Sequence, residues 1–251
     1  MKIGFIGVGV IASCMIEGFC DLSNEHQFFL SPRNAQKSAA LAAKYSNTTV
    51  CDCNQSVVDQ SEVVFISMLA TNCLDILRGL NFRADQRIVN LVATIPPEDI
   101  IDAVGLTKSF SHVIPLPAIK QRIGPIAAFP ESIFLADLLA PMGTVVFAKS
   151  MDEIRAMQAI TGLMAAFYDM LHHLTIFAEG EGLGIEESTS FISTFFASLC
   201  HNTKDASFAE LAAEMTPGGL NELAQKTLSE DGAIKAWADV MAPVMERIKR
   251  S

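Results

Sequence analysis

The fold is decided close to the N-terminus, where residues 2–12 read K-I-G-F-I-G-V-G-V-I-A. The apolar run Ile3–Ile6 is typical of a buried strand, and Ile11–Phe19 reads as a helix. The glycines between them fit the pattern G-x-G-x-x-A, which binds the pyrophosphate of a dinucleotide when it links a strand to a helix. We therefore predict that this turn contacts such a cofactor through Ile6, Gly7, Gly9, Val10, Ile11 and Ala12.

Three positions of this turn have separate roles. Gly7 permits the tight turn, Gly9 lets the backbone approach a pyrophosphate, and Ala12 lets the helix pack close to the strand. The N-terminus of the helix presents free backbone N–H groups and a partial positive charge. An acidic chain can therefore bind phosphates without a cluster of basic side chains.

The end of the second predicted strand indicates which dinucleotide is bound. An enzyme that uses NAD usually places Asp or Glu there to hold the ribose 2′-hydroxyl group. Residues 30–34 read L-S-P-R-N, so no carboxylate is present to repel a 2′-phosphate. Ser31 can donate a hydrogen bond and Arg33 offers a planar, charged fork. The sequence therefore predicts NADP(H) as the cofactor.

Strand-like and helix-like segments alternate through the first 150 residues. Helix-like segments such as Ala35–Tyr45 and Asn72–Leu80 separate the strands, which predicts a parallel sheet covered on both faces. The predicted strands are Ile3–Ile6, Gln27–Leu30, Val63–Met68, Arg87–Val92, Phe110–Ile114, Ile126–Phe129 and Thr144–Phe147.

After Lys149 only helical patterns remain, and Asp152–Ala178 reads as one long helix. The fold class predicted is α/β, with a Rossmann-type, doubly wound sheet in residues 1–150 and an all-α domain in residues 151–251. The further predicted helices are Glu186–His201, Phe208–Met215, Asn221–Ser229 and Ala233–Lys249.

The composition restricts the possible partners. The chain has 251 residues and a net charge of −10, which disfavours nucleic acid. Residues 1–150 carry 11 basic and 13 acidic side chains, whereas residues 151–251 carry 7 and 15, so the second part is the acidic one. No apolar stretch is long enough for a membrane span, and the six cysteines lack the spacing of a disulfide scaffold or a metal site. A cytoplasmic protein without metal is expected.

Four motifs resemble those of pyrroline-5-carboxylate reductases, which are NADPH-dependent reductases of a cyclic imine. They are the opening at residues 2–9, S-P-R-N at 31–34, D-C-N at 52–54 with S-E-V-V-F-I at 61–66, and E-M-T-P-G-G at 214–219. The resemblance covers most of the chain. It implies a Rossmann-type domain followed by a helical domain that pairs with a second copy, giving a homodimer or a larger assembly.

The resemblance also implies residue roles. Asn54 would contact the adenosine ribose, Met68 and Leu69 would line the cofactor, and Ala93 would lie near the nicotinamide. The turn at residues 216–221 would approach the substrate carboxylate with its backbone N–H groups. The substrate residues implied are Thr216, Gly218, Gly219, Leu220 and Asn221.

The chain departs from the family on the substrate side. The family's M-P-N-T-P-A after the sixth strand is I-P-L-P-A-I at residues 114–119, and its A-V-K-P is S-M-L-A at residues 67–70. The S-G-S-G-P-A motif is reduced to T-G-L-M-A-A at residues 161–166. The cofactor half of the pattern is therefore retained, whereas the substrate half is largely rewritten.

Three histidines are candidates for proton donation. On the long predicted helix, Tyr168 and His172 share one face, as do Asp169 and His173. His112 ends the sixth predicted strand on the cofactor side of the sheet. A histidine can donate a proton near neutral pH, so His172, His173 and His112 are the predicted catalytic residues.

Three functions remain open at this point. The first is an NADPH-dependent reductase of a C=N bond, acting on a small cyclic imine carboxylate. The second is a 3-hydroxyacid dehydrogenase acting on an oxo acid. Such enzymes have a layout similar to this chain, but they place a catalytic Lys on the first long helix. Residues 152–178 contain no Lys. The third is a regulatory protein that binds NADPH without turnover.

Overall fold

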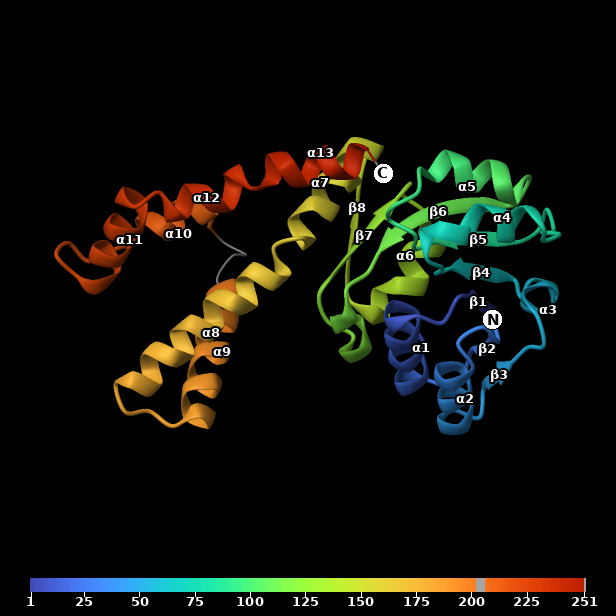
Figure 1. The fold of residues 1–251 in the computed structure, drawn as a ribbon, viewed down its shortest axis with the longest axis horizontal. Helices are drawn as coiled ribbons and strands as arrows, with labels where there is room; N and C mark the ends of the chain where they lie inside the picture. The colour runs from blue at the N-terminus through green and yellow to red at the C-terminus, as the bar shows by residue number, and fades with distance from the viewer. Residues whose placement is uncertain (202–205, 251) are drawn as a thin grey trace. The chain divides into compact units, whose positions relative to one another are not determined.

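The computed structural model describes residues 1–201 and 206–250. The chain divides into two compact units (Figure 1). The first unit comprises Met1–Gln158 together with the C-terminal residues from Ile248 onward. The second unit comprises Ala159–Arg247.

The first unit is built on one eight-stranded sheet in the order β3-β2-β1-β4-β5-β6-β7-β8. The first six strands run parallel, in the order of a doubly wound dinucleotide-binding fold, which confirms the predicted fold class. The strands are β1 (Lys2–Ile6), β2 (Gln27–Leu30), β3 (Thr48–Val50), β4 (Val63–Ile66), β5 (Arg87–Asn90), β6 (Ser109–Ile114), β7 (Pro125–Phe129) and β8 (Thr144–Phe147).

The last two strands reverse the direction of the sheet. β7 runs antiparallel to β6, and β8 runs parallel to β7. Between β6 and β7 the chain forms only the 3₁₀ helix η2 (Pro117–Gln121), which is too short a connection for a parallel crossover. Between β7 and β8 the helix α6 (Ile133–Leu139) supplies that crossover. The expectation of an entirely parallel sheet is therefore wrong for this edge.

Helices cover both faces of the sheet, each over its own apolar core. On one face α1, α2 and α6 pack over a core that includes Phe5 and Phe65, whose stacked rings are 4.7 Å apart. On the other face α3, α4 and α5 pack over Ile66 and Ile88. The helices are α1 (Val10–Leu22), α2 (Ala35–Lys44), α3 (Asn54–Gln60), α4 (Cys73–Arg78), α5 (Pro97–Val104) and α7 (Met151–Thr161).

Two of the predicted helices are interrupted. The segment Asp152–Ala178 is divided between α7 and α8, because the N–H of Gly162 turns back to the carbonyl of Ala159 in a 3₁₀ bond (2.9 Å). The segment Ala233–Lys249 is divided at Val240, since Pro243 has no N–H to continue the helix. The helices after α7 are α8 (Met164–Gly180), α9 (Ile185–His201), α10 (Phe208–Ala213), α11 (Leu220–Glu230), α12 (Ala233–Asp239) and α13 (Met241–Lys249).

The second unit has almost no core within one chain. Among its described residues only Ala159 and Ser188 are buried. Large apolar side chains are exposed on α9, α10 and α11, including Phe191, Phe208 and Leu220. In the described part of the chain, no helix is both long enough and apolar enough to cross a membrane.

Candidate functional site

The glycine turn after β1 contains two glycines with different surroundings. Gly7 has a φ of +95°, and a Cβ placed there would lie 2.4 Å from the carbonyl oxygen of Ser67 at the end of β4. Gly9 has an ordinary φ of −89°, and a Cβ placed there would meet no protein atom within 4 Å. The fold therefore requires Gly7, whereas at Gly9 the chain leaves open space that a ligand can enter.

The N-terminus of α1 opens onto this space. Gly9 is the N-cap residue, no side chain caps the helix, and its first turn contains no acidic residue. The first backbone N–H bonded within the helix is that of Ser13, which donates to the carbonyl of Gly9 (3.1 Å). The N–H groups of the first turn are therefore available to an anion, and the helix dipole favours one there.

Ser31 and Asn34 fix the turn to the end of β2. Ser31 is 1% exposed, and its Oγ accepts a hydrogen bond from the N–H of Gly7 (2.9 Å). Asn34 Nδ2 donates to the carbonyl of Val8 (3.0 Å), while Asn34 Oδ1 caps α2 by accepting from the N–H of Lys37. Ser31 thus positions the turn, and its hydroxyl hydrogen remains able to donate to a ligand.

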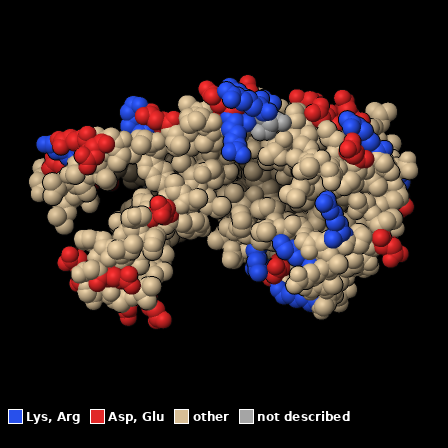
Figure 2. All heavy atoms as spheres, viewed as in Figure 1, with Lys and Arg blue, Asp and Glu red and all other residues tan. Residues whose placement is uncertain are grey.

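Two cations stand beside this turn, and the sequence predicted only one of them. Arg33 precedes α2, and Lys37 lies in its first turn. Within the described residues neither side chain has a carboxylate partner. A lysine in the first turn of a helix interacts unfavourably with the helix dipole. This unfavourable position is the sequence signal by which Lys37 could have been predicted as a ligand-binding residue. Basic side chains gather over α1 and α2 in Figure 2.

These elements enclose a pocket of about 680 Å³ at the carboxyl ends of β1, β2, β4 and β5. The strand order reverses between β1 and β4, which is where open α/β sheets bind their ligands. Of the predicted cofactor residues, those lining the pocket are Gly7, Gly9, Val10, Ile11, Ser31, Arg33, Asn54, Met68 and Leu69. Ile6 and Ala12 are buried beneath it. The sequence reasoning did not include Val8, Asn34, Ala35, Lys37, Ser67, Ile76 and Leu91.

Ala93 and His112 line a different, smaller pocket in the first unit. The register of β5 and β6 places His112 directly opposite Asn90. Asn90 Oδ1 accepts from the N–H of Val92 (2.9 Å), so Asn90 Nδ2 donates to Nδ1 of His112 (2.8 Å). The ring proton therefore lies on Nε2. Burial, with a smaller contribution from the charge of Arg155, lowers the pKa of His112 to about 4. This histidine is neutral near pH 7 and is a poor proton donor there.

His172 and His173 belong to the second unit, where both are exposed on α8. His173 Nδ1 lies 2.9 Å from the backbone carbonyl of Asp169 within the same helix. The structure therefore does not bring the three predicted catalytic histidines together within one unit. None of the residues that line the larger pocket is His, Asp, Glu, Cys or Tyr.

The turn before α11 holds the predicted substrate residues. Gly218 has a φ of +71°, and the N–H of Gly219 donates to the carbonyl of Thr216 (2.9 Å). The N–H of Gly218 donates to the carboxylate of Glu222 (2.5 Å), a residue that the sequence reasoning did not single out. The N–H groups of Leu220 and Asn221 stand in the first turn of α11, where no backbone carbonyl of the helix accepts them.

The first unit matches a known family of oxidoreductases. Residues 2–109, which include the glycine turn and the ends of β2 and β4, match the model of a family described as NADP oxidoreductase, coenzyme F420-dependent. No curated protein matches the sequence significantly.

Solved structures extend the likeness to the whole chain. Pyrroline-5-carboxylate reductase from Streptococcus pyogenes is 18% identical with a TM-score of 0.84, covering 100% of this chain and 99% of that one. The Plasmodium falciparum pyrroline carboxylate reductase, solved with NADP bound, is 15% identical with a TM-score of 0.84, covering 100% and 97%. A reductive aminase from Aspergillus terreus, in complex with NADPH and ethyl-5-oxohexanoate, is 16% identical with a TM-score of 0.61, covering 99% and 92%. The chain therefore has the pyrroline-5-carboxylate reductase fold, and the predicted resemblance is confirmed at that level.

Proposed function

We propose that the protein is an NADPH-dependent reductase of a C=N bond, similar to pyrroline-5-carboxylate reductases, which acts on a small cyclic imine carboxylate. The larger pocket of the first unit carries this proposal, because free helix amides meet there, beside an open glycine, with two cations that have no carboxylate partner in the described part of the chain. The match of residues 2–109 to an NADP oxidoreductase family supports it, as does the fold shared with imine-reducing enzymes.

The residues of the larger pocket fit NADP(H). The first turn of α1 suits the pyrophosphate, and the space at Gly9 admits it. Arg33 and Lys37 suit a 2′-phosphate, because they supply positive charge that no carboxylate neutralises. Asn54 suits the adenosine ribose, and Met68 and Leu69 offer apolar surface. When bound, the cofactor supplies a hydride.

The absence of an acid from the larger pocket favours an imine over an oxo acid. A ketone that accepts a hydride needs a proton on its oxygen, whereas a protonated imine already carries its proton on nitrogen. The residues that line the pocket offer no carboxylic acid, histidine or tyrosine, and His112 is neutral near pH 7. Helices α7 and α8 contain no Lys, which counts further against a 3-hydroxyacid dehydrogenase.

We further propose that the turn from Thr216 to Asn221 faces the substrate and that the second unit forms a homodimer. The dimer is supported by the exposed apolar faces of α9 to α11, which one chain leaves in water. His172 and His173 remain predictions for the proton relay, and the cytoplasmic location remains a prediction from the cysteine pattern.

The test is NADPH oxidation with a panel of cyclic imines, including pyrroline-5-carboxylate, and of 2-oxo and 3-oxo acids. We expect oxidation with imines and none with oxo acids. Oxidation with oxo acids alone contradicts the proposal and favours the dehydrogenase. Tight NADPH binding without turnover of any candidate contradicts it too, and favours a regulatory protein.

A further inference from the structure

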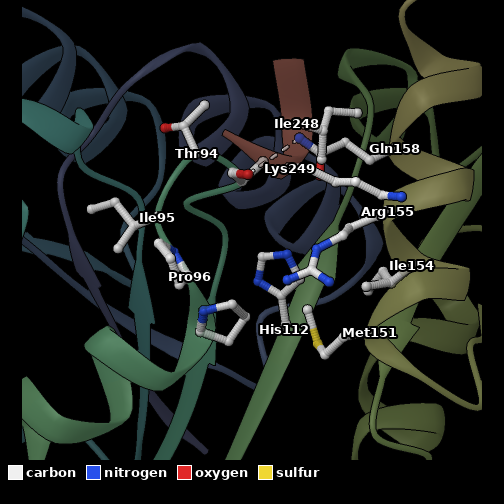
Figure 3. Close-up of a pocket in the computed structure, with 12 residues that line it drawn as sticks. Thr94, Ile95, Pro96, His112, Met151, Ile154, Arg155, Gln158, Ile248 and Lys249 are labelled. Atoms are coloured by element: carbon white, nitrogen blue, oxygen red, sulfur yellow. Dashed lines mark hydrogen bonds between the residues drawn. The ribbon is translucent and has the colours of Figure 1, made fainter. Parts of the chain in front are cut away.

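The small pocket beside His112 has a lining of unusual charge. Its volume is about 50 Å³, which is room for one or two waters or a small polar group. Two of its lining residues, Arg155 and Lys249, are cationic, and none is acidic. Figure 3 shows these side chains converging from the β5–α5 connection, β6, α7 and the C-terminal segment. The residues concerned all belong to the first unit.

His112 presents an N–H donor to this pocket. The side chain is 3% exposed, and Asn90 occupies Nδ1, so the hydrogen lies on Nε2. The ring of His112 makes no other hydrogen bond among the described residues. In Figure 3 the ring points toward the space between Gln158 and Arg155. Nε2–H faces the pocket without an acceptor among the described residues, so a ligand that accepts a hydrogen bond can bind there.

Arg155 supplies further donors and a charge at the same place. Its Nη1 donates to Asp152 (3.1 Å), whose side chain is 83% exposed and lies outside the pocket lining. A guanidinium carries five N–H donors, so one such contact leaves others for a second acceptor. Lys249 adds charge and has no carboxylate partner in the part of the chain that the structure describes.

We propose that this pocket binds a carboxylate group, held by the guanidinium of Arg155 and by Nε2–H of His112, with Lys249 adding charge beside them. A carboxylate offers two oxygens in the plane that a guanidinium recognises. A water molecule can accept from His112, but it supplies no negative charge for Lys249 and leaves the other guanidinium donors of Arg155 without an anion. The size of the pocket admits the carboxylate itself and little more.

The carboxylate has two possible sources. Ala93, which lines this pocket, lies two residues after Leu91, which lines the larger pocket. The carboxylate of the imine substrate can therefore be the occupant, in place of the turn at residues 216–221 that the resemblance implies, and this step rests on the proposed function. A free small carboxylate that acts as an effector has the same chemistry. The binding itself does not depend on the reductase activity.

The test measures formate binding to the full chain, by the shift of the thermal unfolding midpoint at constant ionic strength. We expect a saturable shift with formate and none with formamide, which has a similar size but no negative charge. Arg155→Gln and His112→Phe should each weaken formate binding at least about tenfold, because hydrogen bonds to charged groups contribute on that scale. NADPH affinity is measured in parallel, and an unchanged value shows that a variant is folded.

Arg78→Gln is the matched control, because Arg78 also pairs with an Asp three residues earlier on a helix but lies outside this pocket. It should bind formate like the unaltered chain. If the unaltered chain shows no saturable shift, or if Arg155→Gln binds formate equally well, the proposal is overturned. Arg155→Gln alone decides the matter should His112→Phe fail to fold.

The kinetics of inhibition by formate during imine reduction distinguish the two sources of the carboxylate. A raised KM at constant kcat means that formate displaces the substrate carboxylate. A lowered kcat at constant KM means that formate acts as a separate effector. Both results support the pocket as a carboxylate site. Formate binding without any imine turnover also supports it, while contradicting the reductase proposal.

Discussion

At the scale of single residues, position in the fold decides what a charged or polar side chain can do. Arg33 and Lys37 beside the glycine turn have no carboxylate partner among the described residues, whereas Lys44, further along α2, pairs with Glu17 (3.0 Å). His112 is held neutral by burial and, to a smaller extent, by the charge of Arg155, which together lower its pKa to about 4. Local sequence predicted Arg33, because the end of the second strand is a recognisable place. The Asn90–His112 pair could not be predicted, because it depends on the register of two strands.

We expect Arg33→Gln and Lys37→Gln each to weaken NADPH binding at least about tenfold and to leave NADH binding nearly unchanged. The reason is that only NADPH carries the 2′-phosphate that these cations would hold. Fluorescence titration with both cofactors provides the measurement. Lys44→Gln is the control on the same helix, and equal losses for NADPH and NADH in Arg33→Gln would disprove the assignment.

His112 makes the stability of the protein depend on pH. Its pKa is lowered from 6.5 to about 4, so between these values the unfolded chain binds a proton that the folded chain does not. Stability is therefore lost as the pH falls from 6.5 toward 4, by on the order of 3 kcal/mol from this group. Urea unfolding at several pH values should show a shallower pH dependence for His112→Gln. Identical slopes for the two proteins would refute this account.

At the scale of elements, the sequence predicts the strands and helices that have a local pattern. It does not predict features that depend on how those elements are connected. The strand–turn–helix at residues 2–12 carries its whole signal in adjacent residues. The reversal of β7 arises from the short connection after β6, and the three-residue edge strand β3 has no apolar run to mark it. The break between α7 and α8 lies in a segment with an uninterrupted helical pattern.

The two glycines of the turn should respond differently to alanine. Gly7→Ala should lower the free energy of unfolding by about 1–3 kcal/mol, because its φ is positive and its Cβ would meet the carbonyl of Ser67. Gly9→Ala should change stability by no more than about 0.5 kcal/mol, since its Cβ has open space. It should nevertheless weaken NADPH binding, which calorimetry measures. A Gly9→Ala chain that binds NADPH normally would contradict the cofactor site.

At the scale of the whole molecule, the two units pose different physical problems. The first unit has an apolar core on each face of its sheet and two pockets of its own. The second unit leaves the apolar side chains of its helices exposed and buries only Ala159 and Ser188 among its described residues. The substrate residues predicted in the second unit could be assigned only by resemblance, because no local pattern there specifies a ligand.

We expect a second copy of the chain to cover the exposed apolar side chains of the second unit. Phe191 on α9 is 70% exposed and stacks on Phe195, so Phe191→Glu should convert the dimer to a monomer. Leu106→Glu is the control, because Leu106 is 91% exposed in the first unit. Sedimentation equilibrium gives the mass. An unaltered chain that sediments as a 27.1 kDa monomer would rule out the dimer.

Hydride transfer from NADPH to the carbon of a C=N bond can be followed directly with an isotope label. NADPH that carries deuterium at the transferred position is incubated with the protein and pyrroline-5-carboxylate, and the cyclic amine product is analysed by mass spectrometry. We expect product with one deuterium per molecule, formed in proportion to the NADPH consumed. Unlabelled product would contradict hydride transfer from NADPH. So would the absence of any product with every cyclic imine tested, if NADPH still binds.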